Sequence, residues 1–123
     1  MATSGTAAVL HGCRIWRNAL VGMNAVIMDG AVIGESALVA AAAFVPAGAV
    51  IPPRMLVAVV PARVLRALTN QEIAWKEEGT REYQTLAQRC CDTLIETTAL
   101  TAPEPDRRPL PVKATAPLHI ARR

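Results

Sequence analysis

The feature that most constrains the fold of this chain is an aliphatic side chain that returns at every sixth position. Valine or isoleucine fills every place in this column, and no place departs from the pattern. The column consists of Val9, Ile15, Val21, Ile27, Ile33, Val39, Val45, Ile51 and Val57. A fixed period of this kind indicates a repeat architecture, in which each unit buries its apolar side against the neighbouring units.

Two further columns accompany the aliphatic one and explain how each repeat turns. Three residues after each aliphatic come the corner residues, Gly12, Asn18, Asn24, Gly30, Ser36, Ala42 and Gly48. Glycine and asparagine reach positive φ at low cost, as a sharp corner requires. One residue later comes a small side chain, at Cys13, Ala19, Ala25, Ala31, Ala37, Ala43 and Ala49. Each small residue stands two positions before the next aliphatic, so both point inward from an extended segment.

These columns predict a mostly β fold, a parallel β-helix of hexapeptide repeats. Three faces of six residues make one coil of about eighteen residues, so the column spans slightly fewer than three coils. An α-helix is excluded, because its period is about 3.6 residues and interior glycine and proline destabilise it. Aromatic residues make up only 3% of the chain, which suits a narrow core of valine, isoleucine and alanine.

The charge of the chain is concentrated near its end. Residues 1–102 hold equal numbers of basic and acidic side chains, and the segment from Pro103 onward supplies the whole net charge of +3. No interleaving of aromatic and basic residues accompanies this segment, so we expect a solvated tail and no nucleic-acid partner.

The cysteines and the apolar segments indicate the compartment. The three cysteines, Cys13, Cys90 and Cys91, form no CxxC motif and are odd in number. We therefore expect free thiols and a reducing, cytoplasmic location. The apolar stretch 37–51 is too short to cross a bilayer and contains Pro46 and Gly48, so we expect no membrane partner.

The sequence divides into four segments. Residues 1–8 are a poorly patterned lead-in, 9–60 are the hexapeptide-repeat β-helix, 61–101 are a C-terminal helical segment and 102–123 are a disordered basic tail. Thr69 and Glu72 form a capping box that marks a helix start. Gly79 is expected to break this segment into helices near 70–78 and 80–97. One buried stripe is expected on them, made of Ile73, Trp75, Tyr83, Leu86, Cys90 and Leu94.

Several motifs of the chain resemble those of a known family. They are Leu10-His11-Gly12-Cys13-Arg14-Ile15, Met28-Asp29-Gly30-Ala31, Pro61-Ala62-Arg63-Val64-Leu65-Arg66 and Gln71-Glu72-Ile73-Ala74-Trp75-Lys76. The chain is similar to the γ-carbonic-anhydrase-like hexapeptide-repeat proteins, in their PaaY/CaiE branch. The resemblance implies a left-handed β-helix and a homotrimer with zinc held by three histidines from two subunits. It also implies activity as a carbonic anhydrase on CO2 and bicarbonate, or as a hydrolase of CoA thioesters in phenylacetate degradation.

Carried over residue by residue, the resemblance assigns one metal ligand, His11. The position of the preceding family ligand, five residues earlier, holds Thr6. The first ligand belongs to an earlier coil, and we expect the chain to be a truncated, C-terminal part of such a protein with an incomplete zinc site. Cys13 belongs to the small-residue column and is expected in the core. Asp29 either orients the imidazole of His11 or simply forms the turn before Gly30.

Three functions therefore remain open, and whether the chain is an enzyme at all is one of the questions. The first is the metal-dependent chemistry of the PaaY type. The second is a hexapeptide acyltransferase in which His11 is a general base acting on an acyl-CoA. The third is a non-catalytic trimerisation module.

Overall fold

A computed structural model describes residues 1–99, 101–102 and 105–106. The contacts of the chain divide it into two units, Met1–Arg81 and Glu82–Arg123, which are considered separately. The first unit is a left-handed parallel β-helix, as the repeat and the resemblance predicted.

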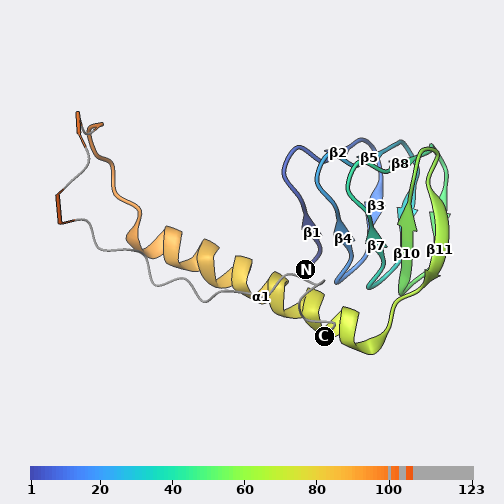
Figure 1. Cartoon of the computed structure of the whole chain (residues 1–123). Coiled ribbons are helices and arrows are strands. Elements are labelled where there is room, and N and C mark those ends of the chain that lie inside the picture. Colours follow the sequence, from blue (N-terminus) through green and yellow to red (C-terminus); the bar gives the residue numbers. More distant parts are fainter. Residues whose placement is uncertain (100, 103–104, 107–123) are drawn as a thin grey trace. The chain divides into compact units, whose positions relative to one another are not determined.

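Short strands stack into the three faces of this β-helix, and each face is one sheet. Figure 1 shows the five strands of the first sheet side by side in the order β1, β4, β7, β10 and β11. One sheet contains β1 (Thr3–Ser4), β4 (Leu20–Val21), β7 (Leu38–Val39), β10 (Met55–Ala58) and β11 (Arg63–Ala67). The second contains β2 (Val9–Leu10), β5 (Val26–Ile27) and β8 (Phe44–Val45). The third contains β3 (Arg14–Ile15), β6 (Val32–Ile33) and β9 (Val50–Ile51).

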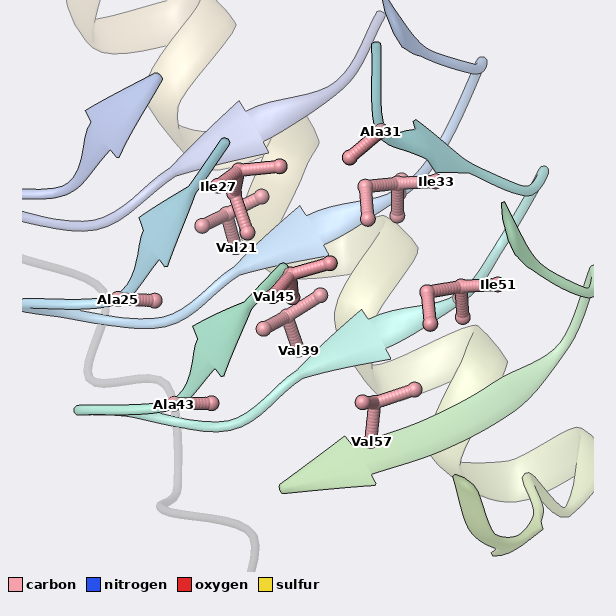
Figure 2. Packing of buried hydrophobic residues seen from close by; sticks show 12 residues of the cluster. Val21, Ala25, Ile27, Ala31, Ile33, Val39, Ala43, Val45, Ile51 and Val57 are labelled. Carbon is pink, nitrogen blue, oxygen red and sulfur yellow. The ribbon is translucent and has the colours of Figure 1, made fainter. Parts of the chain in front are cut away.

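The core is the line along the axis where the aliphatic and small columns meet. Figure 2 shows Val21, Val39 and Val57 stacked on one face, with Ile27 above Val45 on another. All five side chains are fully buried. Valine and isoleucine keep few rotamers in a strand, so they fill a narrow channel with little loss of side-chain freedom. The predicted inward column is therefore confirmed over coils two and three.

The corners confirm the column that was assigned to them. All seven predicted corner residues have positive φ, from 56° at Asn24 to 69° at Gly48. The pattern continues with Ala7 before the column and with Arg54 after it, and Val59, in the turn between β10 and β11, also has positive φ. Each corner therefore places one residue in the left-handed region, even where the residue is not glycine.

The register of the first coil differs from the predicted one. Leu10, and not Val9, is paired with Ile27, so the spacing between partners there is one residue short of a full coil. The segment from Leu10 to Ile15 has one residue fewer than the other repeats, which shifts everything before it by one place. In the shifted register Ala2 and Ala8 pack against the core. Residues 1–8, expected to be a lead-in, therefore contain β1 and the first corner.

The segment after the repeat also differs from the prediction. Its first element is β11, which pairs antiparallel with β10 and lies within the part expected to be helical. It is followed by a single helix, α1 (Asn70–Thr93), so the expected break at Gly79 is wrong. One glycine costs a helix only about 1 kcal/mol, which a long helix tolerates.

The start of α1 has the predicted capping box. The hydroxyl of Thr69 accepts a hydrogen bond from the amide of Glu72 at 3.2 Å, and the Glu72 carboxylate accepts one from the amide of Thr69 at 2.9 Å. Arg66 donates two further hydrogen bonds to this carboxylate. Since Glu72 is buried, these three donors to its carboxylate offset the cost of removing its charge from water.

Within the first unit, α1 lies along the corners at Asn18, Ser36 and Arg54. Arg54 donates a hydrogen bond to the Asn70 side chain, and Asn18 donates one to Glu77 at 2.8 Å. The Lys76 amine donates to the backbone carbonyl of Asn18. The face that α1 buries is therefore Glu72, Ile73 and Lys76. The predicted stripe is wrong beyond Ile73 and the half-buried Trp75, since Tyr83, Leu86, Cys90 and Leu94 are exposed.

The second unit contains the remainder of α1 and the residues after it. Cys90 and Cys91 are exposed free thiols on this part of the helix, and Cys13 in the first unit is also free. Most of the expected disordered tail, 102–123, lies outside the described residues. No helix in the described part of the chain is long and apolar enough to cross a membrane.

Candidate functional site

His11 stands at the corner that joins the second sheet to the third. It directly follows β2, and its backbone amide donates a hydrogen bond to the carbonyl of Ile27 at 2.9 Å. This bond belongs to the ladder between coils, so the backbone at His11 is fixed. The side chain is about two-thirds exposed. The imidazole is therefore available to a molecule approaching from outside.

The imidazole has a carboxylate partner one coil further along the chain. Nδ1 of His11 lies 2.9 Å from Oδ2 of Asp29, and both side chains are more than half exposed. The two residues directly precede Gly12 and Gly30, whose backbones are hydrogen-bonded between successive coils, and this brings the two side chains together. The orienting contact proposed for Asp29 is therefore present. Because Nδ1 is occupied, Nε2 is the nitrogen left to bind a metal or accept a proton.

Glycine at position 12 provides the room for this pair. A Cβ at Gly12 would lie 2.4 Å from Oδ1 of Asp29, far closer than two such atoms can approach. The backbone carbonyl of Gly12 also accepts a hydrogen bond from the amide of Gly30 at 2.9 Å, which holds the two corners in register. The carboxylate of Asp29 thus rests over the bare Cα of Gly12. Sequence reasoning assigned Gly12 only to turning the chain and missed this steric role.

The other residues weighed as ligands lie elsewhere. Cys13 is half-buried and packs against the core, as expected for the small-residue column. The backbone carbonyl of Thr6 accepts a hydrogen bond from Asn24 at another corner. The second histidine, His119, lies outside the described residues.

A zinc ion in a catalytic site needs three protein ligands close enough together to bind the same ion. Among the described residues, no group of three or more His, Cys, Asp and Glu side chains is placed to hold a metal ion. His11 has the free Nε2 and the carboxylate partner typical of a zinc ligand. It is one ligand, however, and the described part of a single chain does not supply the set.

A second polar region lies in the first unit, but its polar side chains are paired with one another. It is lined by Arg17, Asn18, Glu35, Ser36 and Glu77, among others. Arg17 and Glu35 pair with each other at 3.4 Å, and Asn18 hydrogen-bonds to Ser36 and Glu77. These side chains satisfy one another, so the His11 corner is the stronger candidate.

Comparison with known sequences gives a consistent set of relatives. The chain is 56% identical, over 103 residues, to the carnitine operon protein CaiE of Citrobacter koseri and to that of Salmonella typhimurium strain LT2. In both cases the match covers 84% of this chain and 52% of the relative. The chain thus spans about half the length of the curated relatives it matches. No protein-family model matches the chain.

Comparison with solved structures gives the same fold. A putative acetyltransferase of Bacillus cereus superposes with a TM-score of 0.68 at 38% identity, covering 71% of this chain and 51% of that one. A hexapeptide transferase family protein of Anaplasma phagocytophilum superposes with a TM-score of 0.66 at 28% identity, covering 71% and 59%.

Proposed function

Since the chain is a hexapeptide-repeat protein related to CaiE, we propose that it acts on acyl-CoA thioesters, with His11 as the general base. The observation that carries this proposal is the exposed imidazole of His11, held at 2.9 Å by the carboxylate of Asp29. Two further findings support it. The structural relatives with the best coverage include a putative acetyltransferase and a hexapeptide transferase family protein, and the pair needs no metal to accept a proton.

The reaction uses the nitrogen that Asp29 leaves free. Nε2 of His11 removes the proton from the hydroxyl or amine of an acceptor while that atom attacks the thioester carbonyl. The tetrahedral intermediate then collapses, the carbon–sulfur bond breaks and coenzyme A leaves as a thiolate. The imidazolium returns its proton to that thiolate, so His11 ends the cycle neutral. If water is the acceptor, the same steps hydrolyse the thioester.

A second candidate is the metal-dependent chemistry of the PaaY type, acting on CO2 and bicarbonate or on a CoA thioester. The similarity to CaiE supports it, as does the free Nε2 of a histidine whose Nδ1 faces a carboxylate. His11 would be one zinc ligand. The other ligands would come from outside the described part of one chain, for example from other subunits of a cytoplasmic homotrimer.

The discriminating experiment measures thiol release from acetyl-CoA by the purified chain, with a panel of small hydroxyl and amine acceptors. His11→Gln removes the base, and Glu35→Gln serves as the matched control, because Glu35 is an exposed side chain at another corner. Each variant is assayed after treatment with a chelator and again after addition of zinc. Hydration of CO2 is followed in parallel.

We expect chelator-resistant thiol release that falls about 10²–10⁴-fold in His11→Gln and is unchanged in Glu35→Gln. Activity that disappears with the chelator, returns with zinc and depends on His11 would replace the first proposal with the second. Absence of both activities in the folded wild-type chain would overturn both and favour the non-catalytic trimerisation module.

A further inference from the structure

We infer that Asp29 is a positioning residue that keeps the ring proton of His11 on Nδ1, and that Gly12 is the position that lets it do so. The inference deepens the proposed function, since it names what selects Nε2 as the working nitrogen. It rests on the contact between the two side chains and on the space above Gly12, and both can be tested without an activity assay.

The carboxylate decides the tautomer because of what each nitrogen can offer it. A neutral imidazole has one N–H and one lone pair, and an ionised carboxylate only accepts hydrogen bonds. At 2.9 Å, Oδ2 of Asp29 therefore favours the form in which Nδ1 carries the proton. The lone pair is then on Nε2, which faces away from Asp29. In the other tautomer, two lone pairs would face each other across the contact and Nε2 would be blocked by a proton.

Gly12 is required for space rather than for its backbone angle. Its φ is +57°, but Ala7 and Ala42 occupy equivalent corners at φ 56° and 57°. The fold therefore accepts alanine at a corner of this kind. At Gly12 alone among the corner glycines, an added Cβ would meet the Asp29 carboxylate, at 2.4 Å. At Gly48, the corner glycine two coils further on, nothing lies within 4 Å of an added Cβ.

This difference supplies a matched pair of variants. Gly12→Ala and Gly48→Ala place alanine at corners with φ +57° and +69°, so both incur a backbone cost. Only Gly12→Ala should push the Asp29 carboxylate away from His11. Asp29→Asn removes the charge and offers an N–H as well as a carbonyl oxygen, so it no longer favours one tautomer.

The test reads the tautomer directly by NMR of ring-¹⁵N-labelled histidine, in the His119→Gln background, which leaves a single histidine. Spectra are recorded at about pH 8.5, where an ordinary histidine is neutral. We expect the protonated nitrogen of the parent chain to be Nδ1. In Asp29→Asn and Gly12→Ala the proton should move toward Nε2, which neutral imidazole favours in water. Gly48→Ala should match the parent.

Two results would overturn the inference: a proton on Nε2 in the parent, or equal spectra for Gly12→Ala and Gly48→Ala in folded protein. Circular dichroism establishes that each variant is folded, and Asp29→Asn tests the same point if Gly12→Ala does not fold.

The readout is independent of the proposed function. An Nδ1 proton in a chain with no activity would keep the inference and remove the function. Where activity is present, Asp29→Asn should lower kcat/KM by about 10–100-fold, the usual effect of losing such a partner.

Discussion

Truncation of Ile27 to alanine tests the claim that the β-helix core is a closed, rigid channel. Ile27 is fully buried in the second coil, with Leu10 paired above it and Val45 stacked below it. Its backbone carbonyl accepts a hydrogen bond from His11, and the next amide, that of Met28, donates to Val45. Because the ladder holds the coil from both sides, the walls of a new cavity cannot move inward.

The magnitude follows from two terms. Removing three carbon atoms forfeits roughly 2.4 kcal/mol of transfer free energy, at about 0.8 kcal/mol each. A residual cavity of roughly 60 Å³ adds about 1.5 kcal/mol, at about 24 cal/mol per Å³. Ile27→Ala should therefore lower the free energy of unfolding by about 4 kcal/mol, a large share of the stability of a small domain.

The assay is urea unfolding followed by circular dichroism, with Ile15→Ala as the control. Ile15 occupies the same inward column but is only half-buried, in the first coil, so its truncation should cost about half as much. With an m-value of about 2 kcal/mol per M, the Ile27→Ala midpoint should fall by about 2 M. A loss in Ile27→Ala no larger than that in Ile15→Ala would refute the rigid-channel argument.

Three further changes test local features of the first unit. Val59 is β-branched at φ 72°, so Val59→Gly should raise the free energy of unfolding by about 0.5–1 kcal/mol in urea unfolding, and a loss of stability would contradict the assigned strain. Gly79 lies inside α1 with nothing within 4 Å of an added Cβ, so Gly79→Ala should stabilise the chain by about 1 kcal/mol, measured in the same way. Burial lowers the pKa of Lys76 below 10.5, against the opposing effect of Glu77, so the unfolded chain holds this proton more tightly. The free energy of unfolding should then rise with pH through the range just below 10.5. Lys76→Met should lose this rise. If the free energy of unfolding depends on pH in the same way in both proteins, the amine is not desolvated.

The candidate site was partly predictable from the sequence. The motif around His11 singled out that residue, and the eighteen-residue coil placed Asp29 one turn beyond it as a partner. The prediction could not choose between an orienting role and a simple turn for Asp29, because a turn depends on the backbone alone, whereas orientation depends on where the two side chains lie in space. The metal-ligand role of His11 stays a prediction.

The sequence by itself determined the elements whose information is periodic or local. The aliphatic positions six residues apart from Ile15 to Val57 require a solenoid, because only a coil of that pitch turns all of them toward the core. The corner column required positive φ, and the capping box marked the start of α1, because each depends on residues a few positions apart.

Tertiary structure alone decided the features that depend on distant residues. The register before Ile15 was decided by the pairing of Leu10 with Ile27. The face that α1 buries depends on the hydrogen bond from Lys76 to the backbone of Asn18, 58 positions away. A pattern of neighbouring residues does not predict a contact between residues so far apart in the sequence. The steric role of Gly12 likewise exists only because stacking places Asp29 directly over it. The repeat determines the backbone path and the inward positions of each coil. Contacts between coils, and between the coils and α1, determine which side chains lie next to one another.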